Sequence, residues 1–430
     1  MARILVTTLP HEGHLNPTFS ISHELKANGH EVIYLDHPFI KKLIAAQGFP
    51  SVPFRGLRPG DIGILWRKYR VEHSQGVEEM RNAIMLFTSR LVVQARFIRK
   101  LIAQYHPNLV LNDVFHYGSA LAAELTGTPW VDCWTAGVMH PESNPYLIPA
   151  QPAHIKLLEQ LFDERWNKAR RALGLREDAP GAFLRPSQWL QLYTSCEDID
   201  PKLPDLGPTA ICVGPCVTDR REPVFNVIPD HWLDTQMPLI YVSLGTFFNN
   251  RPNFIRRIID AATGQKYRVV VSTPMAGKRG FTALPDNVLL CKRVAQTSLL
   301  SRCALFITHG GNNSVQEAML AGVPMLVVPI AGEQVYNAER VKWLGLGERA
   351  NVDDTDSGEF RNLIQAMLIK LNYRKSAEDI ARKLGRYNGP QVAAQLIQRL
   401  LHTGKPVARR DGYSMSIAGD TDTSAILHDS

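Results

Sequence analysis

Residues 308 to 317 combine a histidine, two glycines and several polar side chains in a pattern that suits anion binding. The sequence 308-THGGNNSVQE-317 follows a short apolar run and continues into a stretch with helical spacing. A strand that turns into a helix in this way presents free backbone N–H groups and the positive end of a helix dipole. The segment therefore predicts a site for a diphosphate, and the chain is expected to bind a nucleotide.

The pair Ser314 and Glu317 has a second interpretation. Ser-x-x-Glu is also a capping box, which satisfies helix N-terminal amides without any ligand. The preceding His-Gly-Gly turn favours the ligand, because small residues let the backbone approach a phosphate closely. For Glu317 taken alone, both interpretations stay open.

A second group of candidates belongs to acid–base chemistry. His14 lies in 9-LPHEGHLNPT-18, directly after a β-branched run. A histidine with a pKa of about 6.5 is partly free base at neutral pH and can take a proton from an alcohol. We predict His14 as the general base, with His11 as the alternative. Asp113, which ends another apolar run, could fix the imidazole tautomer, although an Asn-Asp turn is also common after a strand.

Alternating strands and helices must position these residues. In the first half, strands are predicted at 4–8, 31–35, 109–111 and 130–133. Helices are predicted between them at 15–28, at about 76–104 and at 119–126. The second half repeats this alternation, with a helix at 253–263 and strands at 239–243, 267–272, 288–290, 305–308 and 325–328. This order predicts parallel sheets with crossover helices.

The predicted fold class is α/β, with two Rossmann-like domains facing each other across a cleft. A segment rich in proline and charge at 201–232 separates the two halves. We place an N-terminal acceptor-binding domain at 1–205, a linker at 206–237 and a C-terminal donor-binding domain at 238–404, whose last helix could pack back on the first domain. Residues 405–430 are polar and without period, which predicts a disordered tail.

The segment 308–334 resembles the donor-binding signature of the family 1 nucleotide-sugar glycosyltransferases, which have the two-domain GT-B fold. The matching residues are Thr308, His309, Gly310, Gly311, Asn313, Ser314, Glu317, Gly322, Val323, Pro324, Pro329, Glu333 and Gln334. The resemblance assigns Glu317 to the ribose, His309 and the following amides, including Asn312, to the diphosphate, and Glu333 with Gln334 to the transferred sugar. Glu333 stands where family members often have Asp.

Two further segments resemble donor-binding parts of this family. In 292-KRVAQTSLL-300, Arg293 stands where a tryptophan usually stacks on uracil, and Val294 and Gln296 are expected near the base edge. A guanidinium plane can also stack on a base. In Ser243-Leu244-Gly245-Thr246, the residues Ser243, Gly245 and Thr246 are expected to face the phosphates, unless this is an ordinary turn with a capping threonine.

The resemblance extends to the N-terminal half. Gly13-His14-x-Asn16-Pro17 is similar to the family motif whose histidine is the general base, and Asp113 takes the place of its partner aspartate. Aromatic and apolar residues in the regions where the family binds its acceptor are Trp66, Tyr69, Phe87, Trp134, Met139 and Tyr146. Of these we predict Trp66, Phe87, Trp134 and Met139 as acceptor contacts for an apolar aglycone. Any single one could instead be a core residue.

Composition limits the other classes of function. The chain of 430 residues has 48 basic and 41 acidic residues, a formal charge of +7 without a long basic arm, which argues against a nucleic-acid partner. Six cysteines form no CxxC pair, and the sequence has no apolar window long enough for a membrane span, so we expect a cytoplasmic protein. The acidic run 352-VDDTD-356 is expected to cap a helix, and neither a metal nor another cofactor is predicted.

Together these features predict an inverting, metal-independent transfer of a hexose from a nucleoside-diphosphate sugar, first of all a UDP-sugar, to a hydroxyl of a small apolar acceptor. The alternatives are a nucleotide-sugar epimerase, a lipid-linked GT-B enzyme at a membrane, and a non-catalytic homologue that binds a nucleotide sugar. The expected partners are the donor and the acceptor, with at most weak membrane-surface contact, in a monomer or weak homodimer.

Overall fold

The computed structural model divides the chain into two compact units. It describes residues 1–38, 40–54, 76–136, 152–179, 186–200, 203, 206–217, 228–233, 236–245, 249–281, 283–330, 332–410, 413–419 and 426–427. Unit 1 consists of Met1–Glu197, Pro201–Thr218 and Tyr387–Ser430. Unit 2 consists of Asp198–Asp200 and Asp219–Arg386.

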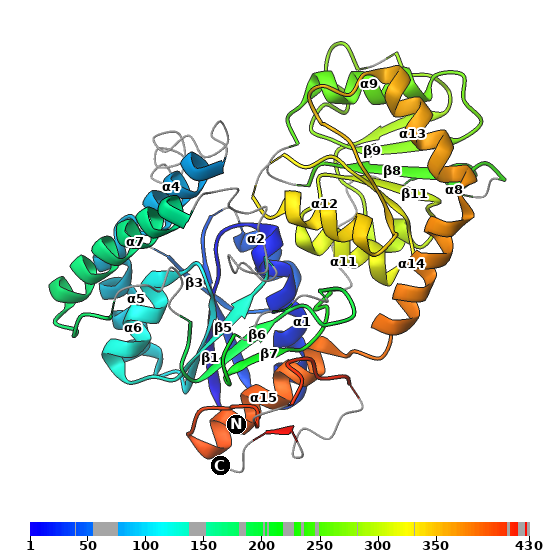
Figure 1. The fold of residues 1–430 in the computed structure, drawn as a ribbon. Helices are drawn as coiled ribbons and strands as arrows, with labels where there is room; N and C mark the ends of the chain where they lie inside the picture. Colours follow the sequence, from blue (N-terminus) through cyan, green and yellow to red (C-terminus); the bar gives the residue numbers. More distant parts are fainter. Residues whose placement is uncertain are drawn as a thin grey trace. The chain divides into compact units, whose positions relative to one another are not determined.

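Unit 1 is built on a seven-stranded parallel sheet with helices on both faces (Figure 1). The strands in spatial order are β3 (Ser51–Pro53), β2 (Glu31–Asp36), β1 (Arg3–Thr7), β4 (Leu109–Asp113), β5 (Trp130–Trp134), β6 (Leu190–Tyr193) and β7 (Ala210–Cys212). The helices are α1 (Glu12–Ala27), α2 (Lys41–Ala46), α4 (Gly76–Phe87), α5 (Leu91–Tyr105), α6 (Tyr117–Thr126), α7 (Pro152–Leu173) and α15 (Gly389–Thr403).

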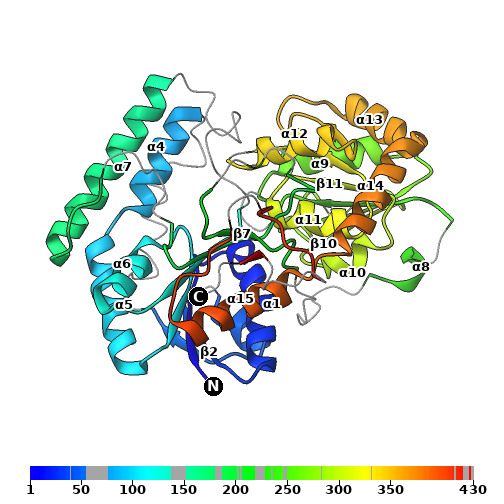
Figure 2. The same cartoon turned by 60° about the horizontal axis from the view of Figure 1, so that its bottom comes forward.

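The alternation of apolar residues along β1 explains why both faces are covered. Ile4 and Val6 point to one face, where they share a core with α1 and α15. Leu5 points to the other face, where it packs with α5 and α6. Successive side chains of a strand lie on opposite faces, so a strand that is apolar throughout has to be covered twice. Figure 2 shows α15 beside α1, from opposite ends of the chain.

Unit 2 has a six-stranded parallel sheet. Its strands in spatial order are β10 (Val288–Cys291), β9 (Arg268–Ser272), β8 (Leu239–Ser243), β11 (Leu305–Thr308), β12 (Met325–Val327) and β13 (Gly347–Arg349). Its helices are α8 (Asp230–Leu233), α9 (Pro252–Ala262), α10 (Gln296–Leu300), α11 (Asn312–Leu320), α12 (Gln334–Trp343), α13 (Ser357–Ile369) and α14 (Leu371–Leu384). In Figure 1, α9 and α13 cover one face of this sheet, and α11, α12 and α14 lie on the other. The predicted α/β class with two Rossmann-like parallel sheets is confirmed.

The domain boundaries differ from the predicted ones in three places. Part of the predicted linker, Ala210–Cys212, is β7, the last strand of the unit 1 sheet. Only four apolar residues, Ala210 to Val213, lie here between prolines and glycines, so the sequence gives a weak strand signal. The last helix, α15, belongs to unit 1, whereas 198–200 belongs to unit 2.

The prediction of a disordered tail is wrong for the described residues of 405–430. Val407, Met415 and Ile417 are buried in unit 1. The backbone of Cys212 donates to Met415 O at 2.7 Å and accepts from Ile417 N at 3.0 Å. β7 is the edge of its sheet and needs partners for its backbone groups, so a short apolar segment can pair there although its composition is polar.

A chain of buried polar residues crosses the middle of the unit 1 sheet. Thr7 Oγ1 donates to Asn112 Oδ1 at 3.0 Å, and Asn112 Nδ2 donates to Asp132 Oδ1 at 2.8 Å. Asp132 Oδ2 accepts from the backbone N–H of Ser187 at 2.6 Å. Burial raises the pKa of Asp132 from 3.8 to about 7, against the lowering effect of these donors. Since the folded state binds this proton more tightly than the unfolded chain, the contribution of Asp132 to the free energy of unfolding falls as pH rises between these values.

This geometry makes a swap of two side chains informative. Asp132→Asn places an amide donor opposite an existing donor, so we expect the free energy of unfolding to fall by roughly 2 kcal/mol. Combining Asp132→Asn with Asn112→Asp restores every donor–acceptor pair, and we expect the double variant to regain most of the loss. Melting temperatures of the wild type, both single variants and the double variant measure this coupling. A double variant no more stable than the single variants would contradict the assigned bonding pattern.

Candidate active site and donor-binding turn

His14 and Asp113 meet at the carboxyl ends of two adjacent parallel strands. β1 pairs with β4 so that Thr7 lies opposite Asn112, which brings the first turn of α1 next to the end of β4. His14 Nδ1 lies 2.7 Å from Asp113 Oδ2. The His14 side chain is 21% exposed and that of Asp113 is fully buried. The two predicted catalytic residues are therefore a contacting pair with one member open to solvent.

Thr135 is a third member of this cluster that the sequence did not single out. It directly follows β5, and its Oγ1 lies 3.0 Å from His14 Nδ1 and 3.5 Å from Asp113 Oδ2. A carboxylate only accepts hydrogen bonds, so Nδ1 carries the proton and Nε2 is the basic nitrogen. Thr135 lies at the end of a strand, as Asp113 does, and this position in the sequence could have identified it as a candidate.

His11 does not take the place of His14 in this pair. Burial, together with nearby His14, lowers the pKa of His11 to about 4, so its imidazole is neutral at physiological pH. The two rings are 6.4 Å apart. His14 Nδ1 contacts the carboxylate of Asp113, which makes His14 the better candidate for the base.

Of the predicted acceptor contacts, Phe87 is connected to the pair through the ring of Phe115. Its ring stacks on Phe115 at 5.2 Å, and Phe115 in turn meets the edge of His14 at 5.9 Å. Trp134 is a core residue, 4% exposed and stacked on Tyr193 at 4.7 Å, as the alternative interpretation expects. Trp66 and Met139 lie outside the described residues, as do Tyr69 and Tyr146.

The His-Gly-Gly turn lies between β11 and α11 in unit 2. Gly310 has a φ of +87°, and a Cβ added there would lie 2.7 Å from Val327 Cγ1. A Cβ on Gly245 or Gly311 would lie 2.7 or 2.6 Å from the ring of His309. The turn thus needs glycine for its backbone and for the imidazole packed against it.

The capping-box interpretation of Ser314 and Glu317 is wrong. α11 begins after Gly311, and no side chain caps it. Instead, Gln296 Nε2 donates to Glu317 Oε2 at 2.6 Å and to Ser314 Oγ at 3.2 Å. The first-turn amides of α11 are thereby left without a side-chain cap, which is the arrangement that an anion site requires.

Gln296 is held in turn by Tyr241, a residue that the sequence did not single out. The Tyr241 hydroxyl donates to Gln296 Oε1 at 3.2 Å. Three predicted donor residues, Gln296, Ser314 and Glu317, are therefore brought together in one buried network. Arg293 and Val294 lie in the loop just before α10, the helix that begins at Gln296. Thr246 lies outside the described residues.

His309 is a neutral, buried member of the turn. Burial lowers the pKa of its imidazole to about 4, and a hydrogen bond with the Ser243 backbone opposes this shift. Its Nδ1 has no hydrogen-bond partner in the part of the chain that the structure describes. Such a buried atom suits an interaction with a hydrogen-bond donor of a ligand.

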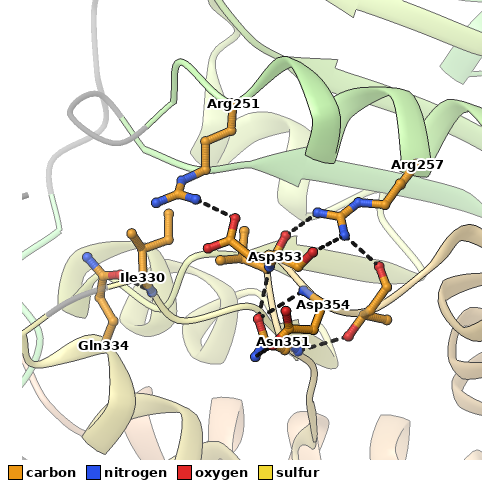
Figure 3. Close-up of polar contacts among 9 residues, drawn as sticks. Arg251, Arg257, Ile330, Gln334, Asn351, Asp353 and Asp354 are labelled. Atoms are coloured by element: carbon orange, nitrogen blue, oxygen red, sulfur yellow. Dashed lines mark hydrogen bonds and ion pairs between the residues drawn. The ribbon is translucent and has the colours of Figure 1, made fainter. Parts of the chain in front are cut away.

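Gln334 and Glu333 lie at the start of α12. Gln334 is 4% exposed, and its Oε1 accepts from Ile330 N at 2.8 Å, so it holds the preceding loop (Figure 3). Glu333 is the residue before the helix and makes no capping hydrogen bond. Their assignment to the sugar stays a prediction.

The acidic run 352–356 caps a helix, as predicted. Asp356 accepts from Glu359 N at 2.8 Å, and Glu359 accepts from Asp356 N at 3.0 Å, forming a capping box at α13. Figure 3 shows Asp353 paired with Arg251, and Arg257 bound to backbone carbonyls of the same loop. Among the described residues, no three His, Cys, Asp or Glu side chains lie together as a metal site. No helix within the described ranges is long and apolar enough to cross a membrane.

Comparison with known proteins agrees with this combination of fold and turn. Over 93% of the chain, it is 26% identical to an NDP-glycosyltransferase of Bacillus licheniformis, covering 97% of that protein. It is 25% identical to the demethyllactenocin mycarosyltransferase of Streptomyces fradiae, over 93% and 87% of the two chains. The solved spinosyn rhamnosyltransferase complexed with thymidine diphosphate matches with a TM-score of 0.71 and 19% identity, over 93% of this chain and all of that one.

The fold and these relatives show a glycosyltransferase with the GT-B fold, similar to the glycosyltransferases of family 1. Within that class, residues 256–400 match the family described as the C-terminal domain of erythromycin biosynthesis protein CIII-like proteins. Its relatives include enzymes of natural-product biosynthesis.

Proposed function

We propose that this enzyme transfers a hexose, with inversion, from a nucleoside-diphosphate sugar to a hydroxyl of a small, largely apolar acceptor. The observation that carries the proposal is the contact of 2.7 Å between His14 and Asp113 at the ends of β1 and β4. Parallel α/β sheets bind their ligands outside the carboxyl ends of their strands. A solvent-accessible imidazole backed by a buried carboxylate at this place suits a general base.

In the proposed reaction, His14 Nε2 takes the proton of the acceptor hydroxyl as its oxygen attacks the anomeric carbon. The bond between that carbon and the diphosphate oxygen breaks on the opposite face, and the diphosphate leaves with the electron pair. The sugar passes through an oxocarbenium-like state. The uncapped amides of α11 are oriented to stabilise the charge that develops on the diphosphate, so the reaction requires no metal.

For the donor we propose a UDP-sugar, with a TDP-sugar as the competing choice. Arg293 stands where an aromatic residue usually stacks on uracil, and one structural relative binds thymidine diphosphate. For the acceptor, the stacked rings of Phe87 and Phe115 beside His14 favour an apolar aglycone. Both choices concern the substrate and leave the reaction class unchanged.

A thermal-shift panel of UDP-, TDP- and GDP-sugars and their free diphosphates tests the donor proposal. A ligand at 100 times its Kd stabilises the folded state by about 2.7 kcal/mol, and we expect UDP compounds to raise the melting temperature by several degrees. ADP-glucose is the control ligand. In Gly311→Ala, a Cβ placed 2.6 Å from the His309 ring should abolish the shift. A panel in which no nucleotide raises the melting temperature would contradict the proposal.

Turnover assays separate the rival functions. An epimerase would isomerise the donor without an acceptor, and a lipid-linked enzyme would need anionic vesicles for activity. A non-catalytic homologue would bind the donor and turn over none of the acceptors offered. We expect transfer in solution, in the presence of EDTA, that depends on the acceptor.

A further inference from the structure

Arg340 is a fully buried arginine next to the donor-binding turn. It lies on α12 and is 1% exposed. Its Nη1 donates to both carboxylate oxygens of Asp200 at 3.0 Å, and its Nη2 donates to Asn312 Oδ1 at 3.0 Å. The Tyr336 hydroxyl completes the cluster by donating to Asp200 Oδ1 at 2.8 Å. All four residues belong to unit 2.

The buried pair of Arg340 and Asp200 is expected to contribute little to the stability of the folded protein. Removing two charges from water is costly, and apolar residues of similar size often stabilise a core as well or better. The buried Arg340 Nε adds to the cost, since it has no hydrogen-bond partner among the described residues. The geometric role of the guanidinium is better defined, because it connects α12 to the residue that begins α11.

α12 holds the donor-binding turn at two points. Asn337 Nδ2 donates to the carbonyl of Gly310 at 2.7 Å, and Arg340 binds the side chain of Asn312 two residues further along the turn. Asn337 and Arg340 are three residues apart, so they share one face of α12. Figure 1 shows α11 and α12 next to each other in unit 2. The two side chains fix the turn on either side of Gly311.

The bond from Arg340 also determines how the Asn312 amide is oriented. Because Oδ1 accepts from the guanidinium, that oxygen is turned toward α12. The C=O and C–N bonds of a carboxamide leave the same carbon in different directions, so the amide N–H groups are directed away from Arg340. Asp200 neutralises the charge of the guanidinium. Arg340 therefore acts by orienting Asn312 and does not itself attract the negative charge of the ligand.

We infer that Arg340, held by Asp200, is a positioning residue that fixes Asn312 at the first turn of α11 for binding of the donor diphosphate. The inference rests on the proposed function, since it names further residues that prepare the same site. It predicts that the pair affects binding of the diphosphate group and leaves binding of the nucleoside unchanged.

The test removes both charges together, because Arg340→Met alone would leave a buried carboxylate. In Asp200→Asn/Arg340→Met, we expect the affinity for UDP, measured by calorimetry, to fall at least about tenfold, which is the effect of one misplaced charge-assisted hydrogen bond. The affinity for uridine should change less than about twofold. TDP and thymidine form the parallel pair. In an Asn312→Ala background, the same double substitution should cause little further loss of UDP affinity.

Arg257→Met is the matched control. Arg257 also anchors a loop of unit 2, but the carbonyls that its guanidinium binds belong to Val352, Asp353 and Thr355, which lie outside α11 and α12. We expect it to lower the melting temperature and to leave the ratio of UDP to uridine affinity unchanged. Wild-type UDP binding by Asp200→Asn/Arg340→Met, or equal losses for UDP and uridine, would overturn the inference alone. Wild-type protein that binds neither UDP nor TDP would overturn the proposed function and the inference with it.

Discussion

His14→Ala is expected to lower kcat by roughly 10³-fold, within the range that general bases contribute. The imidazole carries the only basic nitrogen of the His14–Asp113–Thr135 cluster, and alanine leaves the acceptor hydroxyl without a proton acceptor. Binding of the donor should be unchanged, since the donor-binding turn belongs to the other unit. Initial rates with saturating donor, together with the thermal shift by UDP, separate the two effects.

His11→Ala is the matched control for this substitution. His11 lies three residues earlier and is the alternative base on sequence grounds, but burial holds the pKa of its imidazole at about 4. We expect its replacement to reduce kcat by less than about tenfold. Full turnover in His14→Ala, or a loss in His11→Ala as large as that in His14→Ala, would refute the assignment of the base.

Asp113→Asn is expected to lower kcat by roughly 10² to 10⁴-fold while the fold is retained. The carboxylate accepts from His14 Nδ1 at 2.7 Å. An asparagine that turns its NH₂ group toward Nδ1 makes that nitrogen the acceptor, so the proton moves to Nε2 and the base is lost. The substitution also removes the negative charge that stabilises the imidazolium formed during the reaction. The melting temperature of the variant, beside its kcat, distinguishes this effect from misfolding.

Thr135→Val provides the control for Asp113→Asn. It removes a hydroxyl that lies 3.0 Å from His14 Nδ1 but leaves the carboxylate in place, so we expect a loss of no more than about tenfold. The double variant His14→Ala/Asp113→Asn should be no slower than His14→Ala, because residues that act as a unit are not additive. A further large loss in the double variant would show that Asp113 acts independently of His14.

The main features of both candidate sites could be predicted because their signals are local. The glycines at 310 and 311 follow an apolar strand and precede a helical pattern, and each step depends on residues close together in sequence. His14 and Asp113 are distant in sequence, yet each directly follows or ends a predicted strand of the same sheet. Since parallel strands place their carboxyl ends at one edge, the rule of strand ends was sufficient to bring them together.

Other parts could not be predicted, because their partners come from distant segments. The capping box of Ser314 and Glu317 is a local pattern, but the side chain of Gln296, the first residue of α10, binds both residues instead. The tail and β7 gave no strong signal, but β7 pairs with β6 on one side and bonds to the backbone of the tail at Cys212. In these cases the hydrogen-bond partner came from a distant segment, so the local sequence could not indicate it.

By itself, the sequence determined the α/β class and the glycine-rich turn after β11, and it placed His14 and Asp113 at neighbouring strand ends, because periodicity, glycine placement and strand ends are properties of short segments. Only the tertiary structure decided that Thr135 joins the pair, that α15 belongs to unit 1, and that Asp200 and Arg340 meet beside Asn312. Asp200 and Arg340 are 140 residues apart, and no local pattern selects one partner for a buried charge. Burial makes that choice, since a charge removed from water is stable only where the fold brings an opposite charge to it.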